Sequence, residues 1–169
     1  METKTYYTFN KSDWPDGLWK SEPDKIQWQD AATGLPCLAK RNFYGAWCGY
    51  VGVDANHPLY GQHYDVPKVE VHGRLTYADS CQTDLPKEKA ICHVPSEGET
   101  DDIWWFGFDC VHSTDFMPAD PIPPDPIPPT INYGRYRTLY YVIAECRSLA
   151  IQLAIYTEEA KAQPSKEQS

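Results

Sequence analysis

Residues 103–110 read IWWFGFDC, an almost unbroken apolar run rich in aromatic side chains. A short apolar run without alternation is typical of a strand that is buried on both faces. We therefore expect this stretch to be an inner strand of a sheet, with the rest of the fold arranged around it. Its last residues, Asp109 and Cys110, lead into a polar run that apolar packing does not explain.

Three earlier segments have the pattern of strands. Residues 25–29 alternate at period two, and residues 35–41 and 46–53 are rich in residues that favour strands. Two weaker candidates follow, a strand at 69–77 with one apolar face and an edge strand at 90–94. Together with the aromatic run, these segments predict about five or six antiparallel strands.

The period changes to that of a helix over residues 136–162. The apolar positions recur at three- and four-residue spacing and are Leu139, Val142, Ile143, Cys146, Leu149, Ala150 and Leu153. The sequence therefore predicts an α+β fold, an antiparallel sheet with one long C-terminal helix packed on it.

The length of 169 residues fits a single domain, 1–169. We expect an N-terminal extension at 1–18 and a frayed tail at 163–169. Residues 118–130 contain DPIPP twice in tandem. Proline at this density excludes helix and central strand, so we expect a stiff proline-rich connection.

The formal net charge of −9 argues against direct binding to nucleic acid or to an anionic membrane, since both need basic patches. It permits a basic protein partner. The chain shows no signal-peptide pattern and no apolar run long enough to span a membrane, so we expect a cytoplasmic protein. In that compartment the six cysteines would be reduced. Walker-type, dinucleotide-binding and helix-turn-helix motifs are absent from the sequence, which disfavours kinases, NAD enzymes and DNA-binding regulators.

The polar run after the aromatic strand brings an acid, a thiol and an imidazole close together in sequence. The candidate catalytic residues are His72, Asp109, His112 and Asp115. The candidate metal ligands are His72, Cys110, His112 and Asp115, from a wider pool that includes Cys92 and His93. Zinc takes four ligands from these residue types, although no diagnostic spacing such as Cys-x-x-Cys is present.

Other interpretations of these residues stay open. Cys110 or Cys92 could be a nucleophile with a histidine as its base. A nucleotide phosphate could bind between His72, Arg74, Thr76 and His112, because arginine and hydroxyl donors suit phosphate. The His-x-Thr pattern at 112–114 matches two-histidine phosphodiesterases, but its second copy is missing. Finally, these side chains could simply satisfy buried backbone groups at strand ends.

A second polar cluster includes three tryptophans and could act in structure or in binding. Its members are Trp19, Glu22, Asp24, Trp28, Arg41 and Trp47. We expect an Arg–carboxylate pair that holds an aromatic layer, with a ligand clamp as the alternative. The candidate ligand-binding residues are Arg41, Tyr50, Thr76 and Trp105.

Six motifs occur in order along residues 19–155. They are LPC (35–37), WCGYVGV (47–53), HPL (57–59), VHGRLTY (71–77), ICHVP (91–95) and DDIWWFGFDC (101–110). Together they resemble an uncharacterised family of small bacteriophage and prophage proteins, to which no activity is assigned. The resemblance would place a glycine at Arg74 and another near Thr114, which puts a shared role of those two residues in doubt. The four candidate catalytic residues fit it without adjustment.

The resemblance implies that the chain is a phage-type interaction protein. Such a protein would bind a host protein, a component of anti-phage defence, and inhibit or divert it through an acidic and aromatic surface. The first alternative is a metal-dependent or nucleotide-phosphate hydrolase, or a nucleotide-signal-binding protein, that uses the His72, Asp109, His112 and Asp115 pocket. The second alternative is a structural or accessory phage protein without a site. The sequence alone does not decide whether the protein is an enzyme.

Overall fold

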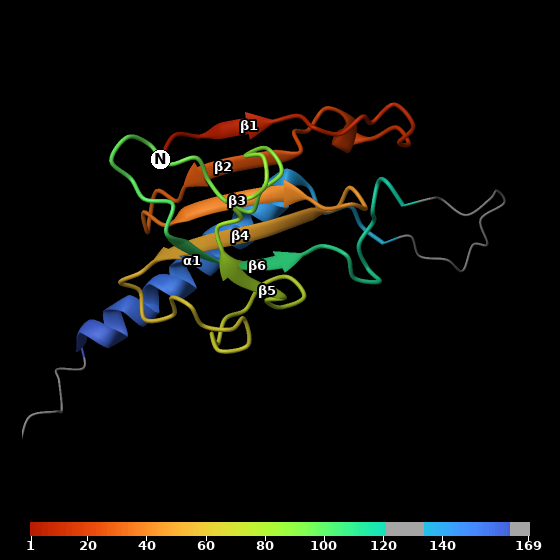
Figure 1. The fold of residues 1–169 in the computed structure, drawn as a ribbon. Coiled ribbons are helices and arrows are strands. Elements are labelled where there is room, and N and C mark those ends of the chain that lie inside the picture. Colours follow the sequence, from red (N-terminus) through yellow and green to blue (C-terminus); the bar gives the residue numbers. More distant parts are fainter. Residues whose placement is uncertain (121–133, 163–169) are drawn as a thin grey trace, which may run out of the picture.

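The computed structural model describes residues 1–120 and 134–162, and it forms one antiparallel sheet with a single long helix (Figure 1). The elements are β1 (Lys4–Tyr6), a 3-10 turn (Leu18–Lys20), β2 (Lys25–Gln29), β3 (Pro36–Arg41), β4 (Trp47–Asp54), β5 (Tyr77–Ser80), β6 (Ile103–Asp109) and α1 (Leu139–Ala162). The six strands are ordered β1-β2-β3-β4-β6-β5, and every neighbouring pair is antiparallel. The α+β fold predicted from the sequence is confirmed.

Helix α1 covers one face of the sheet and packs across β3 and β4 (Figure 1). Its predicted apolar stripe is fully buried at Val142, Cys146 and Leu149, in one core with Phe106 and Phe108 of β6. The helix comes close to the sheet where β4 has a glycine. A Cβ at Gly49 would lie 2.4 Å from the ring of Phe108 and 2.7 Å from the sulfur of Cys146, so any side chain there would force the layers apart.

The opposite face of the sheet is covered by the loop between β5 and β6, which crosses in front of the strands in Figure 1. Ile91 from this loop packs with Leu38, Tyr50 and Trp105 in a second core cluster. Strand β6 therefore lies between β4 and β5 and is buried on both faces, as its unbroken apolarity predicted.

Two strand predictions are wrong. Residues 69–76 form bends and coil, and only Tyr77 begins a strand. The chain cannot extend there because Gly73 and Arg74 both have positive φ, 67° and 108°. Residues 90–94 are not a strand either. Side chains hold their backbone instead: Ile91 N donates to Gln82 Oε1 (2.9 Å) and Val94 N to Gln27 Oε1 (2.8 Å).

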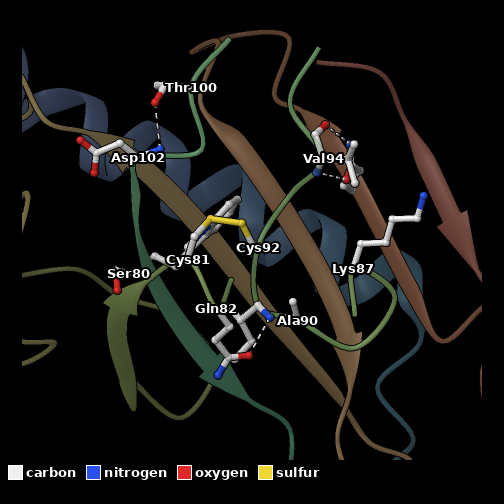
Figure 2. Close-up of a disulfide and its surroundings, with 12 residues drawn as sticks. Ser80, Cys81, Gln82, Lys87, Ala90, Cys92, Val94, Thr100 and Asp102 are labelled. Atoms are coloured by element: carbon white, nitrogen blue, oxygen red, sulfur yellow. Dashed lines mark hydrogen bonds between the residues drawn. A yellow bond between two sulfur atoms is a disulfide. The ribbon is translucent and has the colours of Figure 1, made fainter. Parts of the chain in front are cut away.

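The prediction of reduced cysteines is wrong for one pair, because Cys81 and Cys92 form a disulfide across this loop (Figure 2). The loop doubles back, so the two Cα atoms, 11 residues apart in sequence, lie 4.7 Å apart, within reach of a disulfide. The remaining cysteines are free and buried, namely Cys37, Cys48, Cys110 and Cys146.

The tandem proline repeat, apart from its first residue, and the predicted frayed tail lie outside the described residues. In the described ranges, 1–120 and 134–162, no helix has both the length and the apolarity needed to cross a membrane.

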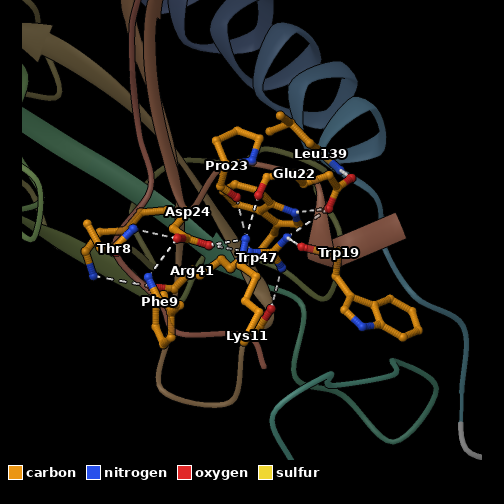
Figure 3. A network of polar contacts seen from close by, with 12 residues as sticks. Thr8, Phe9, Lys11, Trp19, Glu22, Pro23, Asp24, Arg41, Trp47 and Leu139 are labelled. Atoms are coloured by element: carbon orange, nitrogen blue, oxygen red, sulfur yellow. Dashed lines mark hydrogen bonds and ion pairs between the residues drawn. The ribbon is translucent and has the colours of Figure 1, made fainter. Parts of the chain in front are cut away.

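Arg41, at the end of β3, is 1% exposed and lies at the centre of a polar network (Figure 3). Its guanidinium pairs with Glu22 (2.8 Å) and Asp24 (3.2 Å) and lies 4.3 Å from the ring centroid of Trp47. Glu22 also accepts a hydrogen bond from the backbone N of Leu139 at the start of α1 (3.1 Å). This is the Arg–carboxylate pair expected from the sequence, and it ties the N-terminal segment, the sheet and the helix together.

We predict that Arg41→Met lowers the free energy of unfolding by about 3–5 kcal/mol, because it leaves the buried carboxylate of Asp24 and the partly buried carboxylate of Glu22 without their guanidinium partner. Arg147→Met is the matched control, since Arg147 is exposed on α1 and should change stability by less than about 0.5 kcal/mol. Urea denaturation of both variants checks this. Equal effects of the two substitutions would show that the network does not support the fold.

Candidate metal centre

The polar run after β6 meets two other segments at the start of α1. His112 and Asp115 lie in the turn that follows β6, and His72 lies in the bend between residues 69 and 74. Arg137 and Tyr141 come from the beginning of the helix region. These residues surround the carboxylate of Asp115, whose side chain is fully buried.

Two imidazoles converge on one oxygen of that carboxylate. His72 Nε2 lies 2.8 Å from Asp115 Oδ2, and His112 Nδ1 lies 3.1 Å from the same atom. The two rings are 5.1 Å apart between centroids, at an angle of 72°. The three donor atoms all lie within 4.8 Å of one another. Donors bound tetrahedrally to zinc at about 2.0 Å are roughly 3.3 Å apart, so small adjustments would bring the three atoms to ligand positions.

Several other polar atoms of His72 and Asp115 are held by surrounding residues. His72 Nδ1 is 3.0 Å from the hydroxyl of Tyr141, and Arg137 Nε donates to Asp115 Oδ1 at 2.8 Å. The carboxylate of Glu145 accepts a hydrogen bond from the backbone N of His72 (2.7 Å). Metal-bound histidines and carboxylates are typically oriented in this way by an outer layer of hydrogen bonds.

Local sequence explains how the two histidines come together. The turn after β6 closes when His112 N donates to Asp115 Oδ2 (3.1 Å) and Asp115 N donates to the carbonyl of His112 (2.8 Å). Gly73, beside His72, has a φ of 67°, and a Cβ there would lie 2.1 Å from the ring of His112. Only glycine suits both the left-handed backbone and the close approach of the ring.

The surroundings of Asp115 lower its pKa. Desolvation would raise the pKa, but hydrogen bonds from Arg137, His72 and His112 outweigh it and bring the value from 3.8 to about 2. The carboxylate is therefore ionised at neutral pH, which is the form that binds a cation.

The structure places the other candidate residues outside this group. Asp109 accepts hydrogen bonds from Thr76 Oγ1 (2.8 Å) and Val111 N (3.2 Å). Cys110 is 1% exposed, and burial raises the pKa of its thiol, which disfavours both a thiolate ligand and a nucleophile. Cys92 and His93 lie in the loop on the opposite face, where the ring of His93 contacts that of Trp105.

The four candidate ligand-binding residues do not share a pocket. Arg41 forms ion pairs with Glu22 and Asp24, and the hydroxyl of Thr76 donates a hydrogen bond to Asp109. Tyr50 and Trp105 are buried in the core opposite α1. The sequence did not reveal Arg137, Tyr141 and Glu145, because helical periodicity marks the apolar stripe and says nothing of which polar residue faces a loop distant in sequence.

A surface cavity of about 490 Å³ opens beside His72. It is lined by Glu70, Val71, His72, Tyr141, Glu145, Ser148 and Gln152. His112 is partly exposed, with 37% of its side chain accessible. Small molecules can therefore reach the edge of the histidine pair from solvent.

Comparison of the chain with protein-family models, with curated proteins and with solved structures gives no match.

We predict that the Asp115 carboxylate stabilises the folded protein in a pH-dependent way. Because its pKa is lowered in the folded state, the contribution is fully present above about pH 3.8 and is lost as the pH falls towards about 2. Asp115→Asn should remove this dependence and lower stability at neutral pH. Urea denaturation from pH 2 to pH 7 measures it.

The control for this experiment is Asp84→Asn, at an exposed position. Its stability profile should follow that of the unmodified protein. If Asp115→Asn also kept the wild-type slope between pH 2 and pH 4, Asp115 would not be the group that titrates there.

Proposed function

We propose that the protein is a metal-dependent hydrolase whose centre is formed by His72, His112 and Asp115, with zinc as the ion. The observation that supports this most directly is the convergence of three ligand atoms within 4.8 Å, each from a different side chain. Two histidines and a carboxylate are a ligand set that hydrolytic zinc centres use.

The ligand number suits hydrolysis. Three protein ligands leave one position of a tetrahedral ion for water, whose pKa the ion lowers towards 7. Tyr141 and Arg137 would hold His72 and Asp115 in place, as they do in the structure. Glu145 lines the adjoining cavity, where its carboxylate could accept a proton from a bound water.

The proposed substrate class is a nucleotide phosphate. A guanidinium has five N–H donors, and the contact of Arg137 with Asp115 uses the one on Nε. The remaining donors and the ion would offset the negative charge of a phosphate, whereas Glu70 and Glu145 in the cavity would repel it. This balance favours a substrate with a single negative charge at the reacting phosphate, as in a phosphodiester.

We predict that the protein with its Cys81–Cys92 disulfide intact, once freed of metal by a chelator, binds one zinc ion per chain. His112→Asn and Asp115→Asn should each lose most of this binding, and Tyr141→Phe should weaken it about 10–100-fold. Titration calorimetry measures the affinity, and elemental mass spectrometry measures the stoichiometry. His63→Asn is the control, because His63 is an exposed histidine paired only with Asp65 in the described structure.

The absence of stoichiometric zinc, or equal losses in the control, would rule out the centre. The zinc-loaded protein is then assayed with a chromogenic phosphodiester, a phosphomonoester and cyclic and linear nucleotides. Zinc binding without hydrolysis of any of them would keep the metal centre and refute the enzymatic role.

We propose as a second candidate that the protein acts in the host cytoplasm by binding a protein of host anti-phage defence. A specific observation favours such a contact. Phe43, Phe9 and Leu85 are 86%, 37% and 44% exposed and line one cavity of about 460 Å³. Exposed aromatic side chains beside a hollow are typical anchors of protein interfaces. The net charge of −9 suits a basic partner.

We predict that a host protein captured from lysate by the full chain is lost with Phe43→Asp and retained with Tyr140→Asp. Tyr140 is the matched control because it is equally exposed, at 84%, on α1. The captured protein is then purified and titrated against both variants. Equal binding by the two variants would refute the Phe43 surface as the interface.

A further inference from the structure

A second group of side chains able to bind a metal lies on the opposite face of the sheet, within the loop between β5 and β6. Cys81, Cys92 and His93 each have a potential ligand atom, and the three atoms lie within 4.8 Å of one another. In the structure the two sulfurs are joined as a disulfide (Figure 2). This group shares no residue with the His72 centre and does not depend on it.

His93, a member of this group, has one buried ring nitrogen without a hydrogen-bond partner among the described residues. The residue is 7% exposed, and its ring lies 5.7 Å from that of Trp105. Among the described residues, none forms a hydrogen bond with its buried Nδ1. A buried polar atom without a partner costs about 1–3 kcal/mol, so its retention needs an explanation. Burial lowers the pKa of His93, which favours the neutral imidazole that binds metals.

The sulfur of Cys81 also lies in surroundings suited to a thiolate. The indole Nε1 of Trp105 points at Cys81 Sγ from 3.3 Å. An N–H donor aimed at a sulfur stabilises negative charge on it and is a common outer contact of metal-bound cysteines.

The loop is held in place by contacts other than the disulfide. The ammonium of Lys25, fully buried, donates to the carbonyls of Ala90 (2.9 Å) and Cys92 (2.8 Å), and it also bonds to the carbonyl of Lys87. Gln27 holds Val94 through two hydrogen bonds, of 2.8 and 3.1 Å. Because these contacts do not involve sulfur, the three ligand atoms would stay close together after the S–S bond is broken.

We propose that Cys81, Cys92 and His93 form a zinc site in the reduced protein, and that the disulfide closes this site in the oxidised protein. A dithiol reductant supplies two electrons and two protons, so that the S–S bond breaks, two thiols form and the reductant becomes a disulfide. Zinc then displaces the two thiol protons and forms two Zn–S bonds and one Zn–N bond, with water as the fourth ligand.

The other cysteines do not compete for the ion. Cys37, Cys48, Cys110 and Cys146 are all buried. Burial raises the pKa of each thiol, to about 12 for Cys48. They therefore remain protonated, and a thiolate–metal signal from the folded protein reports on Cys81 and Cys92.

The test uses Co²⁺ as the probe on the full chain, oxidised or reduced with dithiothreitol and then freed of reductant without air. We expect the reduced protein to take up one more Co²⁺ than the oxidised protein and to show a near-ultraviolet thiolate-to-cobalt absorption. Cys81→Ser should abolish this absorption, and His93→Gln should weaken Co²⁺ binding by at least about tenfold. His112→Asn, in the other centre, should leave the absorption intact.

Equal Co²⁺ uptake by the oxidised and reduced protein would overturn the proposal, as would a thiolate–cobalt signal that survives Cys81→Ser. Unchanged affinity in His93→Gln would refute the three-ligand site. The oxidised and reduced forms have the same sequence, so this comparison holds even if a variant fails to fold.

Discussion

Strand β6 has apolar side chains on both faces, so each face of the sheet must be covered by another part of the chain. Phe106 and Phe108 face α1, and Trp105 faces the other way. The described chain has only one helix long enough to cover a sheet face. The other face is therefore covered by a loop. Because this loop lacks the backbone hydrogen bonds of paired strands, its backbone groups need other partners. This explains why a disulfide, a buried lysine and two glutamines together hold one irregular segment in place.

The same constraint brings the candidate centre together. The turn that follows β6 meets the segment that leads into α1, because Arg135 N donates to the carbonyl of Thr114 (2.7 Å) and Arg137 Nε donates to Asp115 Oδ1 (2.8 Å). That turn contains His112 and Asp115, and the helix region contributes Arg137 and Tyr141. His72 joins them because Gly73 and Arg74 bend the chain before β5 begins. The polar group is thus a product of how the chain closes the core at one end of the inner strand β6.

Sequence patterns predicted the parts of this fold that rest on periodicity. The strand at 25–29 and the helix at 139–162 follow from the spacing of apolar residues, the strands at 36–41 and 47–54 from residues that favour strands, and the strand at 103–109 from an unbroken apolar run. The sequence patterns failed where the backbone conformation of single residues decides the path of the chain. The alternation over 69–77 is real, but consecutive residues with positive φ prevent a strand.

The candidate site was likewise predictable in part from the sequence. His112 and Asp115 were identifiable as polar residues that follow a buried strand, and His72 as a polar residue of the strand predicted at 69–77. Their partners Arg137, Tyr141 and Glu145 depend on the helix register and on contacts between segments far apart in sequence. The pairing of Cys81 with Cys92 depends on the path of an irregular loop, for which the sequence has no periodic signal.

Both outer strands of the sheet are short. Strand β1 has three residues and β5 has four, whereas the inner strands β4 and β6 have eight and seven. A second molecule would therefore find few consecutive backbone groups to pair with at either edge. Lys4 and Asp79 add charge at these edges, which further opposes strand addition. A protein with so many aromatic side chains in its inner strands is in this way protected from edge-to-edge aggregation.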